Sequence, residues 1–156
     1  WMFAVHALWT RSRLSATVTY LWGSTLTTQA MLTPDLASEF PEPHFLMFWG
    51  MHVLIVWAAF HVVFGLRLLP TWATYRHTVV ITAVWAAAVM VYNVAADTNY
   101  GYLNGKPASA SALDLLGPWP FYVLAEIAVI VAVCALITWP WTRRSRHLPT
   151  PAVDLP

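Results

Sequence analysis

Charged residues and cysteine are both scarce in this chain. Only 10% of its 156 residues are Asp, Glu, Lys or Arg, whereas 59% are hydrophobic, which is far from the average for a soluble domain. The one cysteine, Cys134, excludes an internal disulfide and any metal site built from a cysteine cluster. The basic residues are scattered between apolar runs and form no nucleic-acid-binding patch. No nucleotide, zinc or haem spacing is present, so we expect no cofactor, no metal and no nucleic-acid partner.

Tryptophan and proline are abundant instead, with ten Trp and eleven Pro. Trp anchors helices at membrane interfaces, and Pro delimits them. Several apolar runs reach the length of about 20 residues that crosses a hydrocarbon core of about 30 Å. We therefore predict an all-α, multi-pass membrane bundle with four complete spans plus an N-terminal helix fragment at 1–9. The predicted spans are 14–31, 45–69, 78–96 and 118–139.

The chain divides by composition into a transmembrane domain, residues 1–139, and a Pro- and Arg-rich tail, residues 140–156. It begins at Trp1 inside an apolar run and without Met, so we expect a segment before it. The span at 14–31 is rich in Thr and Ser, as is typical of a helix packed among other membrane helices. Thr33 and Pro34 offer an N-cap and a proline at the first helical position, which predicts a short surface helix over 32–40.

Charge is segregated along the chain, and this predicts an orientation. Basic residues fall at alternate ends of successive spans and so on one side of the membrane, with Lys106 as the exception. The acidic residues of the loops fall on the other side. By the positive-inside rule we expect the arginine side and the C-terminus to be cytoplasmic, in a multi-pass protein of the plasma membrane. The basic residues in question are Arg11, Arg13, Arg67, Arg76, Arg143, Arg144 and Arg146, and the acidic ones are Asp35, Glu39, Glu42, Asp97 and Asp114.

The stretch from 99 to 120, NYGYLNGKPASASALDLLGPWP, predicts an ordered lid rather than a slack linker. Asn104-Gly105 is a strong turn signal, because both residues tolerate positive φ. Ser111 and Asp114 have the spacing of a capping box, which predicts a short helix over ALDLL that ends at Gly117 with positive φ. The lid residues we expect to matter are Asn99, Tyr100, Tyr102, Lys106, Asp114 and Trp119.

Motifs in this stretch also resemble a known family. TNYGYL, the following KP and LDLLGPWPFY, preceded by YLWG, TQAMLTPDL, the FP at 40–41 and the intramembrane His52, resemble the YwaF family of bacterial integral membrane proteins over about residues 20–139. The resemblance implies a helical membrane protein distantly similar to eukaryotic transmembrane phospholipid acyltransferases. In related proteins a His-Cys segment lies upstream of the first loop, and nothing in this sequence matches it.

Polar residues at similar depths predict a layer in the outer half of the membrane. His52 and Glu126 lie seven and eight residues into spans entered from the lid side, so both sit about 10–12 Å deep. Intramembrane ionisable residues are costly unless paired, so we predict that His52 and Glu126 approach each other in a layer that also contains Asn93. This layer is either a headgroup pocket with His52 as base or a network that holds helices together. Its members are Gln29, His52, Asn93, Asp97 and Glu126.

Two functions remain open. One is a non-enzymatic, lipid-associated accessory subunit of a lipid-handling or lipid-transport complex, with membrane lipid and other membrane proteins as partners. It is favoured because no nucleophile and base can be paired from the sequence. The other is a phospholipid acyltransferase or lipid hydrolase, which the family resemblance implies. Cys134 is not a nucleophile in either hypothesis, because its apolar surroundings favour packing over catalysis.

Overall fold

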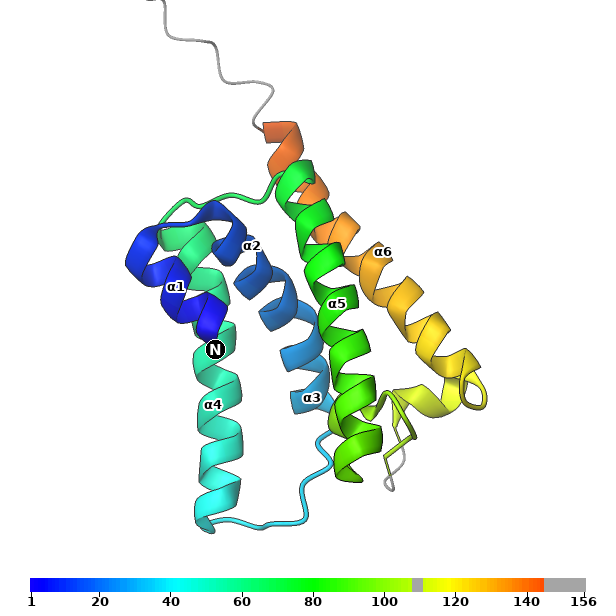
Figure 1. Cartoon of the computed structure of the whole chain (residues 1–156). Helices are drawn as coiled ribbons and strands as arrows, with labels where there is room; N and C mark the ends of the chain where they lie inside the picture. The colour runs from blue at the N-terminus through cyan, green and yellow to red at the C-terminus, as the bar shows by residue number, and fades with distance from the viewer. Residues whose placement is uncertain (108–110, 145–156) are drawn as a thin grey trace, which may run out of the picture.

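A computed structural model describes residues 1–107 and 111–144, and these residues form helices and loops without a strand (Figure 1). The all-α prediction is confirmed. Three helices are long and apolar enough to cross a membrane, Pro43–Gly65, Trp72–Ala96 and Phe121–Arg143. The remaining predicted span, 14–31, is a continuous helical stretch at 13–32, but it is too polar to count as a membrane-crossing helix. The tail from 145 onward lies outside the described residues.

The polar helix at 13–32 lies at the centre of the bundle. It consists of α2 (Arg13–Trp22), the π-helical stretch η1 (Gly23–Thr27) and α3 (Thr28–Leu32). As predicted for a helix packed among others, every residue from 15 to 21 is buried. Several of its Thr hydroxyls bond to their own helix, as from Thr17 to the carbonyl of Arg13 at 2.8 Å, or to α5, as from Thr17 to Thr74 at 2.9 Å. Hydrogen bonds of this kind allow a Thr side chain to be buried in a helix without an unpaired hydroxyl.

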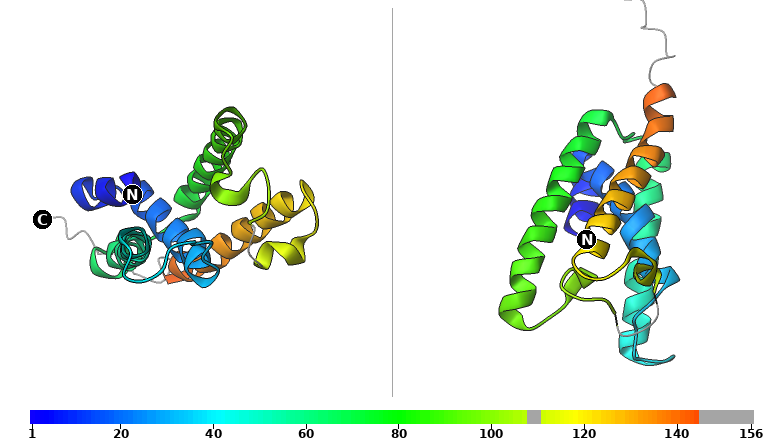
Figure 2. Two further views of the ribbon diagram at one scale, coloured as in Figure 1. Left: turned by 90° about the horizontal axis from the view of Figure 1, so that it is seen from below. Right: turned by 90° about the vertical axis from the view of Figure 1, so that its right-hand side faces the viewer.

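The other helices surround this central one (Figures 1 and 2). Helix α1 (Met2–Thr10) folds back on α2, and α4 (Pro43–Phe60) with the π-helical η2 (His61–Gly65) packs on the central helix beside α1. Helices α5 (Trp72–Ala96) and α6 (Phe121–Arg144) complete the bundle. Near the start of α5, Tyr75 donates to the carbonyl of Val131 at 3.0 Å. From there α5 and α6 diverge towards the lid.

Several predicted boundaries are wrong for local reasons. Helix α5 begins six residues before 78, because Thr71 and Thr74 form a capping box that starts a helix directly after the turn. Helix α6 continues through Pro140 to Arg144, so the part of the tail that is described is helical. The short helix predicted over 32–40 does not form after Leu32. Leu32 and Phe40 remain exposed in the structure, so a helix here would not be stabilised by packing, and an isolated helix of that length is unstable.

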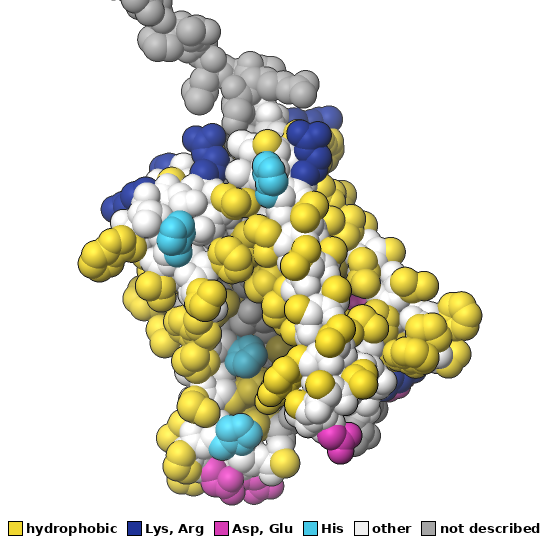
Figure 3. Space-filling view, viewed as in Figure 1, with side chains coloured by type: hydrophobic (Ala, Val, Ile, Leu, Met, Phe, Trp, Pro, Cys, Tyr) yellow, Lys and Arg dark blue, Asp and Glu magenta, His cyan; other side chains and the backbone are white. Residues whose placement is uncertain are grey.

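The predicted segregation of charge is visible on the surface (Figure 3). Lys and Arg side chains gather at the end where α6 finishes, which we call the arginine end, and Asp and Glu gather at the opposite, lid end. Lys106 is the predicted exception and pairs with Asp114, 3.4 Å away, at the lid end. Between the two ends the surface is mostly apolar, as a membrane-crossing bundle requires.

The segregation gives a test of topology. In a Cys134→Ala background, we expect Leu115→Cys, at an exposed lid position, to react with an impermeant thiol reagent on intact cells. Arg13→Cys, at the arginine end, should react only after permeabilisation. Labelling of position 13 but not of position 115 on intact cells would show that the protein has the opposite orientation.

Candidate functional site

The lid, residues 99–120, is fastened to α5 by one buried side chain, Asn93. Its amide nitrogen donates to the carbonyl of Tyr100 at 3.1 Å and to the Oδ1 of Asn104 at 2.8 Å. Its amide oxygen accepts from the backbone N–H of Tyr100 at 2.9 Å and from the hydroxyl of Thr98 at 3.1 Å. Asn93 is only 2% exposed. Its place in the predicted layer is therefore that of an anchor for the lid.

The lid is also tied to two other parts of the chain through Tyr102. Its hydroxyl donates to Asp35 at 3.0 Å, in the loop before α4, and its carbonyl accepts from the hydroxyl of Tyr122 on α6. Burial and the Asp35 carboxylate raise the pKa of the Tyr102 phenol. Tyr102 itself has a φ of 53°, and Gly101 beside it has a φ of 68°. The turn with positive φ is therefore at 101–102; the chain also bends at the predicted Asn104-Gly105, but neither of these residues has a positive φ.

The second half of the lid follows its predicted capping box. The Ser111 hydroxyl accepts from the N–H of Leu113 at 3.3 Å, and the Ser111 N–H donates to Asp114 at 3.0 Å. The hydrogen bond from the Ser111 backbone, together with Lys106, lowers the pKa of Asp114. A short 3-10 helix, Ala112–Leu116, results, and Gly117 ends it with a φ of 90°. Both local predictions are confirmed.

Beneath the lid lies a cavity of about 420 Å³, which we call the lid cavity. Its walls are α5, α6 and the helix at 13–32, and the lid roofs it through Tyr102, Leu103 and Leu113. Most of the lining is apolar, including Trp85 on α5 and Val133 on α6. The volume falls within the range of small-ligand pockets, about 300–1,000 Å³. The divergence of α5 from α6 (Figure 1) gives it this space.

Polar groups on two facing helices line the lid cavity. Glu126 comes from α6, and Ser24 and Gln29 come from the central helix. Gln29 donates to Thr33 at 3.0 Å. Glu126 makes no hydrogen bond or ion pair with any described residue, and the hydroxyl of Ser24 is buried without a hydrogen-bond partner in that same part of the chain. The sequence identified Gln29 and Glu126 as site residues but missed Ser24, which is one of many hydroxyl residues in its helix.

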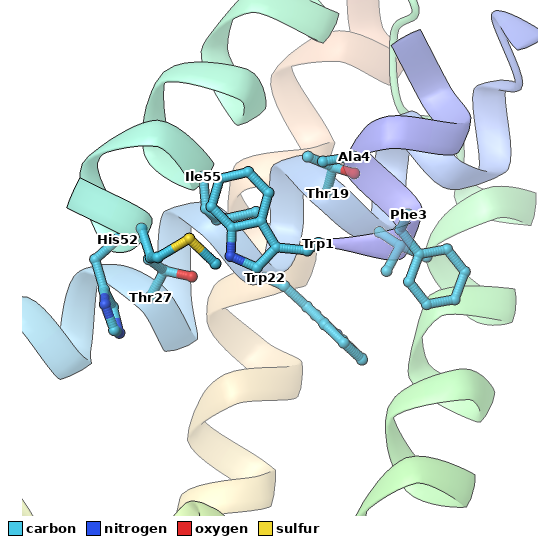
Figure 4. Close-up of a pocket in the computed structure, with 10 residues that line it drawn as sticks. Trp1, Phe3, Ala4, Thr19, Trp22, Thr27, His52 and Ile55 are labelled. Carbon is cyan, nitrogen blue, oxygen red and sulfur yellow. The ribbon is translucent and has the colours of Figure 1, made fainter. Parts of the chain in front are cut away.

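His52 lies in a different cavity, of about 290 Å³, between α1, the central helix and α4 (Figure 4). Trp1, Thr27 and Ile55 line it with His52, which lies at one edge of the group. The Nδ1 of His52 is 2.7 Å from the carbonyl oxygen of Phe48. A carbonyl can only accept, so Nδ1 donates this hydrogen bond, and Nε2 makes no hydrogen bond to any described residue. This second site we call the α1–α4 cavity.

The predicted pairing of His52 with Glu126 is wrong. No hydrogen bond or ion pair joins them, and they line different cavities. The central helix at 13–32 contributes residues to the lining of both cavities, and His52 on α4 and Glu126 on α6 each line the cavity on their own side of it. Asp97 is also outside the predicted layer, because it is an exposed residue with a φ of 51° at the end of α5. The five predicted residues thus have separate roles.

Serine hydroxyls meet histidine rings at two places among the described residues. His6 and Ser15 are 2.8 Å apart between α1 and α2, and Ser38, in the loop before α4, is 3.4 Å from His44 in the first turn of α4. Neither pair lines the lid cavity or the α1–α4 cavity. Ser15 is only 5% exposed, which suits a link between two helices and not a nucleophile. Cys134 is buried in the core, as the sequence predicted.

Comparison with known protein families places the chain in a group of membrane proteins. The model of the TMEM164 family matches residues 1–138. The chain belongs to the TMEM164 family. The match runs from the first residue through α4, α5 and the lid, and it ends within α6. It confirms a transmembrane protein family but not the YwaF family that the motifs suggested. No curated protein and no solved structure matches the chain.

Proposed function

We propose that this membrane protein is a non-enzymatic accessory component of a lipid-handling or lipid-transport assembly and that it holds a lipid in the lid cavity. The observation that supports this most is the lid cavity itself, which combines apolar walls with a few polar side chains, among them Ser24 and Glu126. Amphipathic pockets of this kind suit a molecule with a tail and a head. The lid fixed by Asn93 separates this site from the aqueous side.

The accessory role is supported by the apolar character of the exposed helix faces and by the location of the serine–histidine pairs. Trp57 on α4 and Val94 on α5 are 68% and 77% exposed, so both helices offer apolar faces to lipid or to partner helices. The serine–histidine pairs that the structure describes lie away from both cavities. A role in binding and assembly requires neither pair to act as a catalyst.

Filling the lid cavity tests the lipid site. Ala86 lines the cavity, whereas its neighbour Ala87 is exposed on the outer face of α5, so the two offer matched positions. We expect Ala86→Trp to reduce the lipid that co-purifies in mild detergent several-fold, as measured by native mass spectrometry. Ala87→Trp should leave it unchanged. Equal lipid retention in both variants would contradict a lipid site under the lid.

A second function, acyl transfer or hydrolysis of a phospholipid, is favoured by His52. Its Nδ1 is held by the Phe48 carbonyl and its ring lines the α1–α4 cavity, so the other ring nitrogen, Nε2, has the access that a general base needs. The test is transfer or release of a radiolabelled acyl chain from a phospholipid by the purified chain. Activity that His52→Gln abolishes would replace the accessory role with this one. Absence of activity in full-length protein that binds lipid would support the accessory role.

A further inference from the structure

The arginines of the arginine end are exposed and have no acidic partner. None of their guanidinium groups makes a hydrogen bond or an ion pair with a residue in 1–107 or 111–144, where the acidic residues lie at or near the lid end. One of them lies 3.8 Å over the Trp139 ring, a contact that does not neutralise its charge. The arginines with described side chains are Arg11, Arg13, Arg67, Arg76 and Arg143. Exposed cations that the protein leaves unpaired are available to an anionic partner.

These arginines lie at the level where the apolar helices leave the membrane. At this end the three candidate spans have Gly65, Trp72 and Arg143 as their terminal residues. Arg67 lies two residues beyond the first span, and Arg76 lies four residues inside the second. Long basic side chains near the end of a span extend to the headgroup region and keep the charge in water. The arginines are therefore placed to meet lipid headgroups.

One hydrophobic core holds the helix ends that carry these arginines. Each of the elements α1, α2, η2, α5 and α6 contributes to this core a residue within four positions of an arginine. These residues are Ala7, Ala16, Val63, Tyr75 and Trp141. The arginines thus gather at one end of the molecule, as the basic side chains in Figure 3 show for the face in view.

Two of the arginines have a backbone conformation that is uncommon for a residue with a side chain. Arg11, at the end of α1, has a φ of 56°, and Arg67, after η2, has a φ of 57°. Glycine or asparagine adopts this conformation more easily, so the turns themselves do not require arginine. An arginine near the end of a helix can bind its last carbonyls, but neither side chain makes such a hydrogen bond to a described residue. A partner outside the protein accounts for arginine at both turns.

We propose that the arginine end is a binding surface for anionic phospholipids of the surrounding leaflet. The guanidinium groups donate to headgroup phosphates, and the acyl chains lie against the apolar helix faces between the two ends. A zwitterionic headgroup carries a cation that the arginines repel, so the surface discriminates by net charge. In the expected orientation it faces the cytoplasmic leaflet, which carries the negative surface potential. This surface lies outside the lid cavity, so the inference goes beyond the proposed function.

Competition between two lipids tests the proposal. The full chain in mild detergent is mixed with equal amounts of phosphatidylglycerol and phosphatidylcholine that have the same acyl chains, and native mass spectrometry counts the bound lipids. Both lipids are added after purification, because lipid at an exposed surface exchanges with detergent. We expect bound phosphatidylglycerol to exceed phosphatidylcholine roughly fivefold, which is the contribution of one arginine near anionic lipid. The combined variant Arg11→Gln, Arg67→Gln and Arg76→Gln should remove most of this excess.

Three control variants separate charge at this end from other effects. Lys106→Gln removes the same charge at the lid end and should keep the excess of phosphatidylglycerol. Lysine at positions 11, 67 and 76 retains the charge and should keep most of the excess. Ala86→Trp fills the lid cavity and should keep it as well, so that failure of the lid-cavity site and failure of this surface give different results. Size-exclusion profiles in the same detergent show that each variant is folded.

Several results would overturn the proposal. Equal binding of the two lipids by the unsubstituted chain would do so, as would equal losses in Lys106→Gln and in the combined glutamine variant. A lysine variant that loses as much as the glutamine variant would show that charge does not select the lipid. Soluble glycerol phosphate at the concentration of the lipids should displace no phosphatidylglycerol, because it has no acyl chains to lie against the helices. Displacement would assign the surface to a free phosphate compound instead.

Discussion

Replacing Asn93 with alanine is expected to release the lid and to lower the free energy of unfolding by about 2–4 kcal/mol, since each of four hydrogen bonds contributes about 0.5–1.5 kcal/mol. The bonds join Asn93 to Thr98, Tyr100 and Asn104. In the variant, the backbone groups of Tyr100 lose their side-chain partner. Unfolding monitored by circular dichroism during titration of a mild detergent with SDS would measure the loss.

Asn99→Ala is the matched control for this prediction. Asn99 also makes two hydrogen bonds, to the carbonyl of Gly105 at 2.7 Å and from the N–H of Asn104 at 3.2 Å, but it is exposed. Water can replace the bonds of an exposed amide, so the control should lose less than about 1 kcal/mol. Hydrogen exchange at residues 98–104 should rise strongly in Asn93→Ala only. Similar exchange in the two variants would show that Asn93 does not hold the lid.

The Asn93→Ala variant also allows the lid cavity and the α1–α4 cavity to be tested separately. Asn93 lies outside the described lining of both cavities, whereas Tyr102 and Leu103, which follow its partner Tyr100, roof the lid cavity. A loosened lid should therefore release a lipid from the lid cavity while leaving the α1–α4 cavity around His52 intact. Lid stability and lipid retention are linked in this way because one buried amide holds the roof of the site.

What the sequence predicted well was determined locally. The capping box of Ser111 and Asp114 and the positive φ of Gly117 depend on neighbours within a few residues, so spacing alone was sufficient. The spans at 45–69 and 118–139 were found because long apolar runs have few other structures available in a membrane. The start of α5 was missed because the capping residues Thr71 and Thr74 form a pair of like hydroxyls, which is a weaker signal than a hydroxyl with a carboxylate.

What the sequence predicted poorly depended on helix order and rotation. Depth along a span placed His52 and Glu126 at the same level, but depth says nothing about which helix stands between two others. The central helix at 13–32 separates them, and this follows from its packing against α4 on one side and α5 on the other. Ser24 was missed for the same reason, because only rotation about the helix axis distinguishes it from Thr27 and Thr28, which do not line the lid cavity.

The packing of the central helix against α4 depends on one glycine and leads to the second large expected effect. A Cβ at Gly23 would lie 2.6 Å from the Cβ of Ala59 and 3.3 Å from the carbonyl oxygen of Ile55. Alanine is the better helix former by about 1 kcal/mol, yet we expect Gly23→Ala to destabilise the bundle by roughly 1–3 kcal/mol, because the two helices must move apart. SDS titration would measure the change.

Gly50 on α4 provides the matched control, because a Cβ there would meet nothing within 4 Å. Gly50→Ala should stabilise the protein by up to about 1 kcal/mol through helix propensity alone. Ala59→Gly in the Gly23→Ala background removes the nearer clash and should recover part of the loss, although the Ile55 carbonyl remains close.

If Gly23→Ala stabilises the bundle as Gly50→Ala does, the central helix and α4 do not pack at this distance. The separation of the lid cavity from the α1–α4 cavity would then lose its structural basis, because the helix at 13–32 keeps them apart only while it is held against α4.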